Sequence, residues 1–395
     1  MFGRRFLVPK VCFFSWSLVF SLAAFGCSVN ISPTPQATSS PQIATVPPSP
    51  ISTSNINPTL PNVTPTYSLP TTKISVTWAS LNLTGKLVYT MGDIQVDALT
   101  VDIQSLDLTT GVITTIFKAP KYSWIYYVTV SPDDKQLIMS YIAPPTNTAP
   151  ARPALYLLPL DGSQAPELLF TPPTADDNYI QAEWSPDGKY IYFTQVNPHL
   201  PSQPGQINPI FNIFRMTYPD GQPEMIVEQA YWPRLSSDSS NMVYVHVDPF
   251  SFKNKLYAAD SDGGNAQQIV LSGSWDPDTK DAPIYSPDGK SIIFSAVVPL
   301  PSYQPNWVEQ LMDIHPAKAD GSIPSDWWSV PMNGGTLKRL THIQSLGLFA
   351  SISPDHQHIA SFSSDGLFVM NPDGSELTSI LRNLGGIPGT VSWIP

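Results

Sequence analysis

Short apolar runs with alternating polarity recur along the chain, and turns rich in Gly, Pro, Asp and Asn separate them. The clearest runs carry β-branched or aromatic residues in a period of two, which is typical of β-strands rather than helices. These runs are Gln136–Met139, Tyr190–Phe193, Met242–Val245, Ser291–Phe294 and His358–Ser361. The pattern therefore predicts an all-β protein built from many short strands.

Each of these strands follows a similar turn, which we call the first turn. Ser185–Gly188 and Ser286–Gly289 read Ser-Pro-Asp-Gly, while Ser131–Asp134, Ser236–Ser239 and Ser353–His356 are variants of it. Pro at the second position and Gly at the fourth suit a tight turn. The copies recur at a spacing of about fifty residues, and a repeat of this size indicates blades stacked around an axis.

A later hairpin turn in each unit gives an independent count of blades. Its copies end in Gly and lie at Leu106–Gly111, Leu158–Gly162, Met216–Gly221, Ala259–Gly263, Pro331–Gly335 and Met370–Gly374. The first unit lacks a clear first turn, and the degenerate Leu83–Lys86 takes its place before the strand Leu87–Thr90. The count predicts a propeller with six blades of four antiparallel strands each.

The repeat resembles that of the TolB-type, WD40-like (PD40) six-bladed β-propellers. In that family Trp-Ser-Pro-Asp-Gly leads into a strand, as Trp184–Phe193 does here. The resemblance covers residues 74–395 and implies the fold. It implies little about function, because such propellers serve as scaffolds, as ligand binders and as enzyme modules.

The C-terminal segment Gly389–Pro395 looks like an innermost strand with no turn after it. Because a closed ring leaves no free strand edges, we expect this segment to pair with the first blade beside Leu87–Thr90. Ile74–Trp78 offers the same innermost strand from the N-terminal side, which would leave an incomplete seventh blade. Both arrangements are open at this stage.

The N-terminus predicts export. Arg4, Arg5 and Lys10 precede the apolar stretch Val11–Phe25, as in a secretory signal. The stretch runs into Ala-Phe-Gly-Cys, which resembles the box of a bacterial lipoprotein, whose cysteine is lipidated and becomes the first mature residue. Residues 1–27 are therefore predicted to be a lipoprotein signal peptide with Cys27 as the lipid attachment site. The alternative is an uncleaved anchor helix.

Residues 28–73 are rich in Pro, Ser, Thr, Asn and Gln and show no regular period, which predicts a disordered tether. About forty-five residues of flexible chain span on the order of 40 Å. Removal of the signal changes the net charge from −11 to −14, a sign that repels nucleic acid and anionic lipid. We therefore expect no nucleic-acid partner, and contact with the bacterial cell membrane through the lipid alone, facing the periplasm or the exterior.

The connection between the second and third strands is long in several blades. Because the first and third turns are tight, these long loops should share the opposite face of the ring, and such loops are often functional. The longest, Val298–Asp326, is rich in aromatic rings beside carboxylates, which suit sugars or an extended peptide. The candidate ligand-binding residues are Trp275, Tyr303, Trp307, His315 and Trp327. Alternatively, the loop packs over its own blade as a lid.

Catalytic motifs are missing from the sequence. It contains neither Gly-x-Ser-x-Gly nor His-Glu-x-x-His. His356 and His358 alternate along a strand but lie just after a tight turn, so we interpret them as surface residues rather than metal ligands. No cofactor, metal site or catalytic residue is predicted.

Two classes of function remain. The first is a cell-envelope lipoprotein whose propeller is a non-catalytic recognition scaffold for a protein or glycan. The alternative is a propeller enzyme acting on polysaccharide, of lyase or glycosidase type. It would need carboxylates or histidines that converge from the innermost strands of different blades. Among the innermost strands Trp124–Val130 and Tyr179–Trp184, Gln181 and Glu183 stand out as polar.

Overall fold

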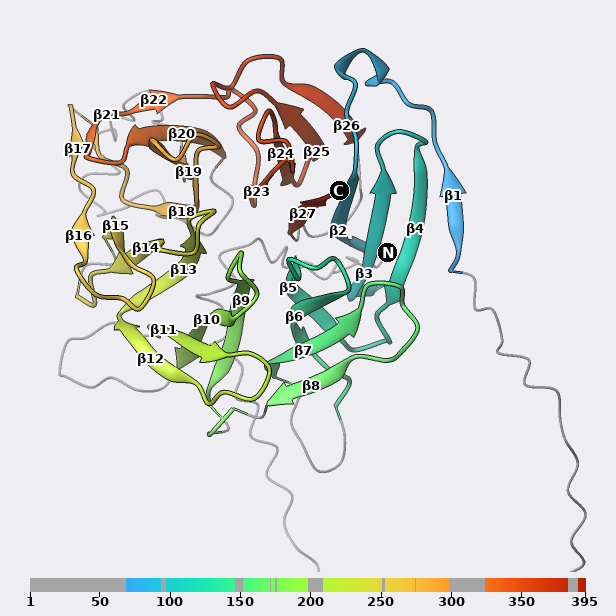
Figure 1. Ribbon diagram of the computed structural model, residues 1–395, viewed down its shortest axis with the longest axis horizontal. Helices are drawn as coiled ribbons and strands as arrows, with labels where there is room; N and C mark the ends of the chain where they lie inside the picture. The colour runs from blue at the N-terminus through green and yellow to red at the C-terminus, as the bar shows by residue number, and fades with distance from the viewer. Residues whose placement is uncertain are drawn as a thin grey trace, which may run out of the picture. The chain divides into compact units, whose positions relative to one another are not determined.

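The protein is a ring of antiparallel sheets (Figure 1). The computed structural model describes residues 69–93, 97–145, 152–170, 172–174, 176–197, 209–250, 253–273, 275–297, 324–382 and 390–395. Within these residues the only helical element is the short 3-10 turn Ala79–Leu81, and no helix there is long and apolar enough to cross a membrane. The predicted all-β, six-bladed propeller is confirmed.

Five of the blades follow the chain in order, each running from its innermost strand to its outermost. Blade 2 contains β5 (Trp124–Val130), β6 (Gln136–Ile142), β7 (Pro153–Pro159) and β8 (Glu167–Phe170). Blade 3 contains β9 (Asn178–Trp184), β10 (Tyr190–Asn197), β11 (Ile210–Thr217) and β12 (Glu224–Glu228). Blade 4 contains β13 (Ala230–Leu235), β14 (Asn241–Val247), β15 (Asn254–Asp260) and β16 (Gln267–Gln268).

Blade 5 contains β18 (Lys280–Tyr285), β19 (Ser291–Val297), β20 (Ser325–Pro331) and β22 (Lys338–Arg339). Blade 6 contains β23 (Phe349–Ile352), β24 (Ile359–Ser363), β25 (Gly366–Met370) and β26 (Thr378–Arg382). A short parallel pair at the rim, β17 (Leu271–Ser272) with β21 (Gly335–Thr336), links blades 4 and 5. Every predicted strand that follows a first turn is present.

The first blade is closed by the C-terminus, as expected. Its innermost strand is β27 (Val391–Ile394), which pairs antiparallel with β2 (Lys86–Asp93), and the sheet continues through β3 (Asp97–Asp107), β4 (Val112–Lys118) and β1 (Thr71–Lys73). The alternative innermost strand Ile74–Trp78 was wrong, because this segment follows β1 on the outer side of β4. Since β1 belongs to the sheet, the folded domain also begins earlier than the predicted boundary at residue 74.

Trp78 fills the seam between the last and first blades. Its side chain is 1% exposed, and its indole N–H donates to the carbonyl of Leu108 in blade 1 at 2.8 Å. It belongs to a core cluster that also contains Phe362 and Leu367 of blade 6. The ring is therefore closed twice, by β27 near the axis and by Trp78 farther out.

The first turns share one hydrogen-bond pattern. In all five copies the Ser hydroxyl donates to the Asp carboxylate two residues later, at 2.6–2.7 Å. The residue at the fourth position has a positive φ in every copy, including the non-glycine residues Asp134, Ser239 and His356. Gly in the two full copies therefore meets a backbone requirement that the variants meet at a cost.

The later hairpin glycines have a different role, because four of them press against the preceding blade. A Cβ at Gly162, Gly263, Gly334 or Gly374 would lie 2.2–2.7 Å from a carbonyl oxygen in the outermost segment of that blade. The hairpin of blade 1 makes the same contact with Ile74, 2.5 Å from a Cβ built on Gly111. In blade 1 the segment after β1 thus takes the position that the outer edge of the preceding blade has in blades 2, 4, 5 and 6.

We predict that the two kinds of turn glycine respond differently to alanine. Gly289→Ala should lower the free energy of unfolding by about 1 kcal/mol, because only its positive φ opposes a side chain. Gly374→Ala should cost about 2 kcal/mol more, because its Cβ would lie 2.2 Å from the carbonyl oxygen of Leu340 in the preceding blade. Urea unfolding of both variants checks this, and equal losses would contradict the contact.

The first-turn carboxylates predict a loss of stability in acid. Hydrogen bonds from neighbouring side chains, Lys189 and Ser185 for Asp187 and Ser236 and Ser240 for Asp238, lower the pKa of each carboxyl to about 2. Their contribution is complete above the ordinary carboxyl pKa of about 4 and disappears as the pH falls through the folded-state value. The urea midpoint should therefore fall between these two pH values, and it should fall less in an Asp187→Asn, Asp238→Asn variant. An identical pH profile for wild type and variant would refute this.

Candidate functional site at the propeller axis

The innermost strands place six side chains at one level around the axis, which we call the axial layer. Five of them lie four residues before the Ser of a first turn. Thr390 is the equivalent residue of blade 1. Trp184, which directly precedes a first-turn Ser, pairs with Ile191, and Trp393 pairs with Leu87 in the same way, so Thr390 lies three residues before Trp393 as Gln181 lies three before Trp184. All six are at most 6% exposed. The layer consists of Thr390, Tyr127, Gln181, Trp232, Ala282 and Phe349, from blades 1 to 6 in order.

Large and small residues alternate around this layer. The aromatic residues come from blades 2, 4 and 6, and their rings touch one another across the axis. Ring centroids lie 5.6 Å apart for Tyr127 and Trp232, 5.6 Å for Trp232 and Phe349, and 6.3 Å for Tyr127 and Phe349. Contacts between alternate blades require that the rings meet at the centre, so they close the axis at this level.

Two of the smaller residues, Gln181 and Thr390, hold the layer together by hydrogen bonds. Gln181 Oε1 accepts from the Thr194 hydroxyl at 2.8 Å and from the Trp232 backbone N–H at 3.0 Å. The Thr390 hydroxyl donates to the Val128 carbonyl at 2.8 Å and accepts from the Val128 N–H at 2.9 Å. Thr390 therefore ties the closing C-terminal segment to blade 2 at the axis.

Backbone irregularities aim these side chains inward. Gln181, Trp232 and Ala282 have φ values of 55°, 59° and 48°, and each lies in a break of strand register. A β-bulge re-aims a side chain, and a left-handed residue with a bulky side chain costs about 1–2 kcal/mol. The repetition of this conformation in three blades shows that the fold maintains the axial layer despite that cost.

We name the two ends of the axis by the connections that surround them. The turn face carries the first turns and the hairpin turns, and the long-loop face carries the other connections. On the turn-face side Glu183 of β9 and Arg234 of β13 form an ion pair, and the guanidinium lies 5.5 Å from the Tyr127 ring. Burial raises the pKa of Glu183, while the charge of Arg234 opposes that shift.

The long-loop side of the layer holds a second polar group. The Tyr231 hydroxyl donates to Asp281 Oδ1 at 2.6 Å and accepts from Asn254 Nδ2 at 2.8 Å. Burial raises the pKa of Asp281, and hydrogen bonds from Tyr231 and Trp232 act in the opposite direction. Asp281 is therefore held in place by its neighbours on the long-loop side of the layer.

Lys280 fixes the crossover that leads into blade 5. Its side chain is 3% exposed, and its ammonium contacts the carbonyls of Asn254 and Pro277 and the carboxylate of Asp276 at 2.5–2.9 Å. Burial lowers the pKa of Lys280. Because these contacts hold the crossover in place, they also position Trp275, whose half-buried ring lies 4.5 Å from that of Trp328.

The predicted ligand-binding residues lie in different environments or outside the described residues. Trp275 lies on the long-loop face, whereas Trp327 is 0% exposed inside β20 and donates its indole N–H to Ser361 of blade 6. Trp327 is therefore a core residue, because β20 begins at Ser325, inside the segment predicted as loop. Tyr303, Trp307, His315 and the lipid site Cys27 lie outside the described residues.

The sequence interpretation singled out Glu183 and Gln181 but missed their partners. Arg234, Tyr231 and Asp281 occupy positions two or five residues before a first-turn Ser, so counting back from that repeated turn would have located them. Within the described part of the chain, no group of three or more His, Cys, Asp or Glu side chains could hold a metal ion.

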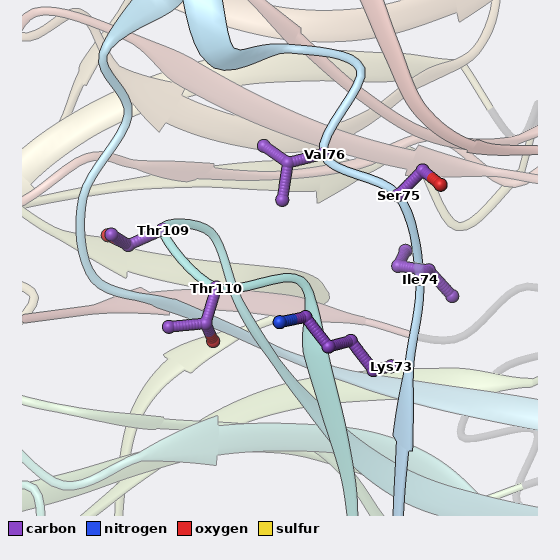
Figure 2. Close-up of a pocket in the computed structure, with 6 residues that line it drawn as sticks. All are labelled: Lys73, Ile74, Ser75, Val76, Thr109 and Thr110. Carbon is purple, nitrogen blue, oxygen red and sulfur yellow. The ribbon is translucent and has the colours of Figure 1, made fainter.

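A shallow hollow of about 750 Å³ lies at the outer edge of blade 1, far from this chemistry (Figure 2). It separates Lys73–Val76 from the hairpin residues Thr109 and Thr110. Lys73 is the one charged residue among the described residues that line it. We therefore place the candidate site at the axis and on the long-loop face.

We predict that the axial ion pair is needed as a pair. Arg234→Met should lower the free energy of unfolding by about 3 kcal/mol, because it leaves the largely buried carboxyl of Glu183 without its partner. Adding Glu183→Leu should recover most of this loss, because the apolar pair leaves no buried charge. Urea unfolding of the single and double variants measures this. A double variant that is no more stable than Arg234→Met alone would contradict the pairing.

Comparisons with known proteins support the fold. No protein-family model and no curated protein matches the chain. Among solved structures, TolB from Acinetobacter baumannii is similar with a TM-score of 0.54 and 20% identity over 79% of this chain and 67% of that one. A putative TolB from Agrobacterium tumefaciens gives 0.49 and 17%, over 79% and 100%. A chain of a nidogen/laminin complex gives 0.53 and 9%, over 78% and 97%. At these identities the two likenesses with TM-scores above 0.5 show the fold alone, a β-propeller like that of TolB from Acinetobacter baumannii.

Proposed function

We propose that this chain is an exported, lipid-anchored cell-envelope protein whose propeller is a non-catalytic recognition scaffold. It binds a protein or glycan ligand through the long-loop face. The observation that carries the proposal is the contrast between the two faces of the ring.

The turn face uses its polar side chains internally. Its Ser and Asp side chains bond within their own turns, and Lys135, Lys189 and Lys290 pair with Asp residues of the same turns. The long-loop face instead presents aromatic rings. The two large aromatic side chains that are most exposed among the described residues, Tyr122 at 58% and Phe250 at 56%, lie in a crossover and a second connection. Aromatic side chains, Trp and Tyr above all, are enriched among the residues that contribute most to binding at protein interfaces.

The axial chemistry favours binding over catalysis. Glycoside cleavage uses two carboxyl groups on either side of one bond. Glu183 lies two residues before a first-turn Ser and Asp281 five before, so the axial layer separates their levels. Each carboxylate also has a partner already, Arg234 for Glu183 and Tyr231 for Asp281. This arrangement supports a scaffold rather than a lyase or glycosidase.

The lipid anchor rests on the sequence. The apolar stretch before Cys27, the basic residues before it and the polar segment after it are those of a lipoprotein precursor. A lipid is a suitable anchor for a processed chain with a net charge of −14, because its surface is not attracted to anionic lipid.

The recognition face is tested by paired substitutions in the full chain, which also carries Cys27→Ser. Each variant is screened for binding to glycan fragments, peptidoglycan fragments and envelope peptides. Tyr122→Ala with Phe250→Ala should weaken binding of the ligand found by about tenfold, because both rings are exposed on the long-loop face. Leu168→Ala with Met225→Ala removes exposed apolar side chains from the rim strands β8 and β12 and should change nothing. Loss of binding in the rim variant, or turnover of any fragment, would contradict the proposal.

The anchor is tested by Cys27→Ser in the native host. The wild-type chain should sediment with membranes and carry a diacylglycerol-modified N-terminal cysteine by mass spectrometry. The variant should lose that modification. An unmodified Cys27 in membrane-bound wild-type protein would favour the uncleaved anchor instead.

A further inference from the structure

Blade 2 carries a run of aromatic residues that leads from its crossover toward the axis. Tyr122, Trp124 and Tyr126 occupy alternate positions, and the next residue, Tyr127, belongs to the axial layer. Tyr122 is 58% exposed, whereas Trp124 and Tyr126 are half-buried. The rings of Trp124 and Tyr126 are stacked, with centroids 4.9 Å apart and planes 13° apart. Because stacked rings cover each other's facing sides, only the outer faces of this half-buried pair are left for a ligand.

The stacked pair has unused polar atoms. Neither the Trp124 indole N–H nor the Tyr126 hydroxyl makes a hydrogen bond to another residue in the described part of the chain. Tyr231 differs, because its hydroxyl donates to Asp281. Burial raises the pKa of Tyr126, so its hydroxyl keeps its proton and can donate. The pair therefore offers an outer aromatic face beside polar atoms that no described residue bonds.

Tyr126 is placed here by the backbone. The register of β5 shifts between Ile125 and Tyr127, so Tyr126 is the extra, unpaired residue of a β-bulge. Such a bulge turns its side chain away from the regular alternation of the strand. Tyr126 also packs against the core cluster that contains Trp232 and Phe349, which fixes its ring beside the axial layer.

We propose that Trp124 and Tyr126 form a subsite for a pyranose ring of a neutral glycan. This inference rests on the proposed function and narrows its ligand from protein or glycan to glycan. A pyranose has an apolar C–H face that stacks on an aromatic ring and hydroxyl groups at its edge that pair with free donors and acceptors. The net charge of −14 that remains after removal of the signal repels a polyuronate, and for this reason we choose a neutral sugar.

The test measures binding of chitotetraose to the full chain carrying Cys27→Ser, by calorimetry. Trp124→Ala should weaken binding by about tenfold through loss of the stacking surface. Tyr126→Phe keeps the ring and the packing but removes the hydroxyl, and should weaken binding by about threefold. The matched control is Tyr257→Phe, since Tyr257 stacks on Tyr244 in blade 4 with centroids 5.7 Å apart, and it should bind as wild type does. Thermal unfolding of each variant confirms that it folds.

The outcomes separate this inference from the proposed function. Chitotetraose binding that is unchanged in both Trp124→Ala and Tyr126→Phe would overturn the subsite. So would tighter binding of tetragalacturonate than of chitotetraose. A third outcome is that chitotetraose does not bind at millimolar concentration, whereas an envelope peptide does. If the double substitution of Tyr122 and Phe250 abolishes binding of that peptide, the subsite is wrong and the proposed recognition scaffold is supported. If the peptide is also insensitive to that double substitution, both fail.

Discussion

The structure depends on the contact of three aromatic rings at the propeller axis. Tyr127, Trp232 and Phe349 come from alternate blades, and each touches the other two. A ring of six blades leaves space at its centre that six large side chains would overfill and six small ones would leave empty. Alternation of large and small residues fills it, much as alternate strands fill the layers of a barrel. The side chains of Gln181 and Thr390 then form hydrogen bonds with neighbouring backbone, and Thr390 thereby ties the closing C-terminal segment to blade 2.

The axial layer also determines what each end of the axis can do. Because the layer lies between Glu183 and Asp281, the two carboxylates belong to separate environments, one paired with Arg234 and the other bonded to Tyr231. On the turn face the Ser and Asp side chains of the first turns form hydrogen bonds with each other. The long-loop face retains aromatic surface at Tyr122, Trp124 and Phe250, and this asymmetry is the physical basis for assigning recognition to one face.

Much of the fold could be predicted from the sequence, because turn chemistry repeats and is local. The Ser-Pro-Asp-Gly turns and the hairpin glycines predicted where the strands lie. The apolar segment before Pro395, which no turn follows, predicted that the C-terminus closes the ring against blade 1. The outer position of Ile74–Trp78 could not be predicted, because an isolated apolar run pairs equally well with either edge of a blade. Trp327 was misplaced for a related reason, since the start of β20 after a long connection carries no turn signal.

The candidate site could be predicted only in part, since it is assembled from different blades. Gln181 and Glu183 stood out as polar residues in apolar strands, but their partners become visible only when the blades are aligned on the first-turn Ser. The bulges that turn Gln181, Trp232 and Ala282 inward have no sequence signature as plain as the Gly of a turn. Nothing in one strand shows which residue of the next blade it faces.

The most direct test of this account is a double-mutant cycle across the axis, with Tyr127→Leu and Phe349→Leu measured singly and together by urea unfolding. The account predicts a coupling of about 0.5–1.5 kcal/mol between these residues of blades 2 and 6, because their rings touch at the centre. The same cycle between Tyr127 and Tyr257, in the third strand of blade 4, should give no coupling. Strictly additive losses for Tyr127 and Phe349 would mean that the rings do not meet and that the axis is not closed by this layer.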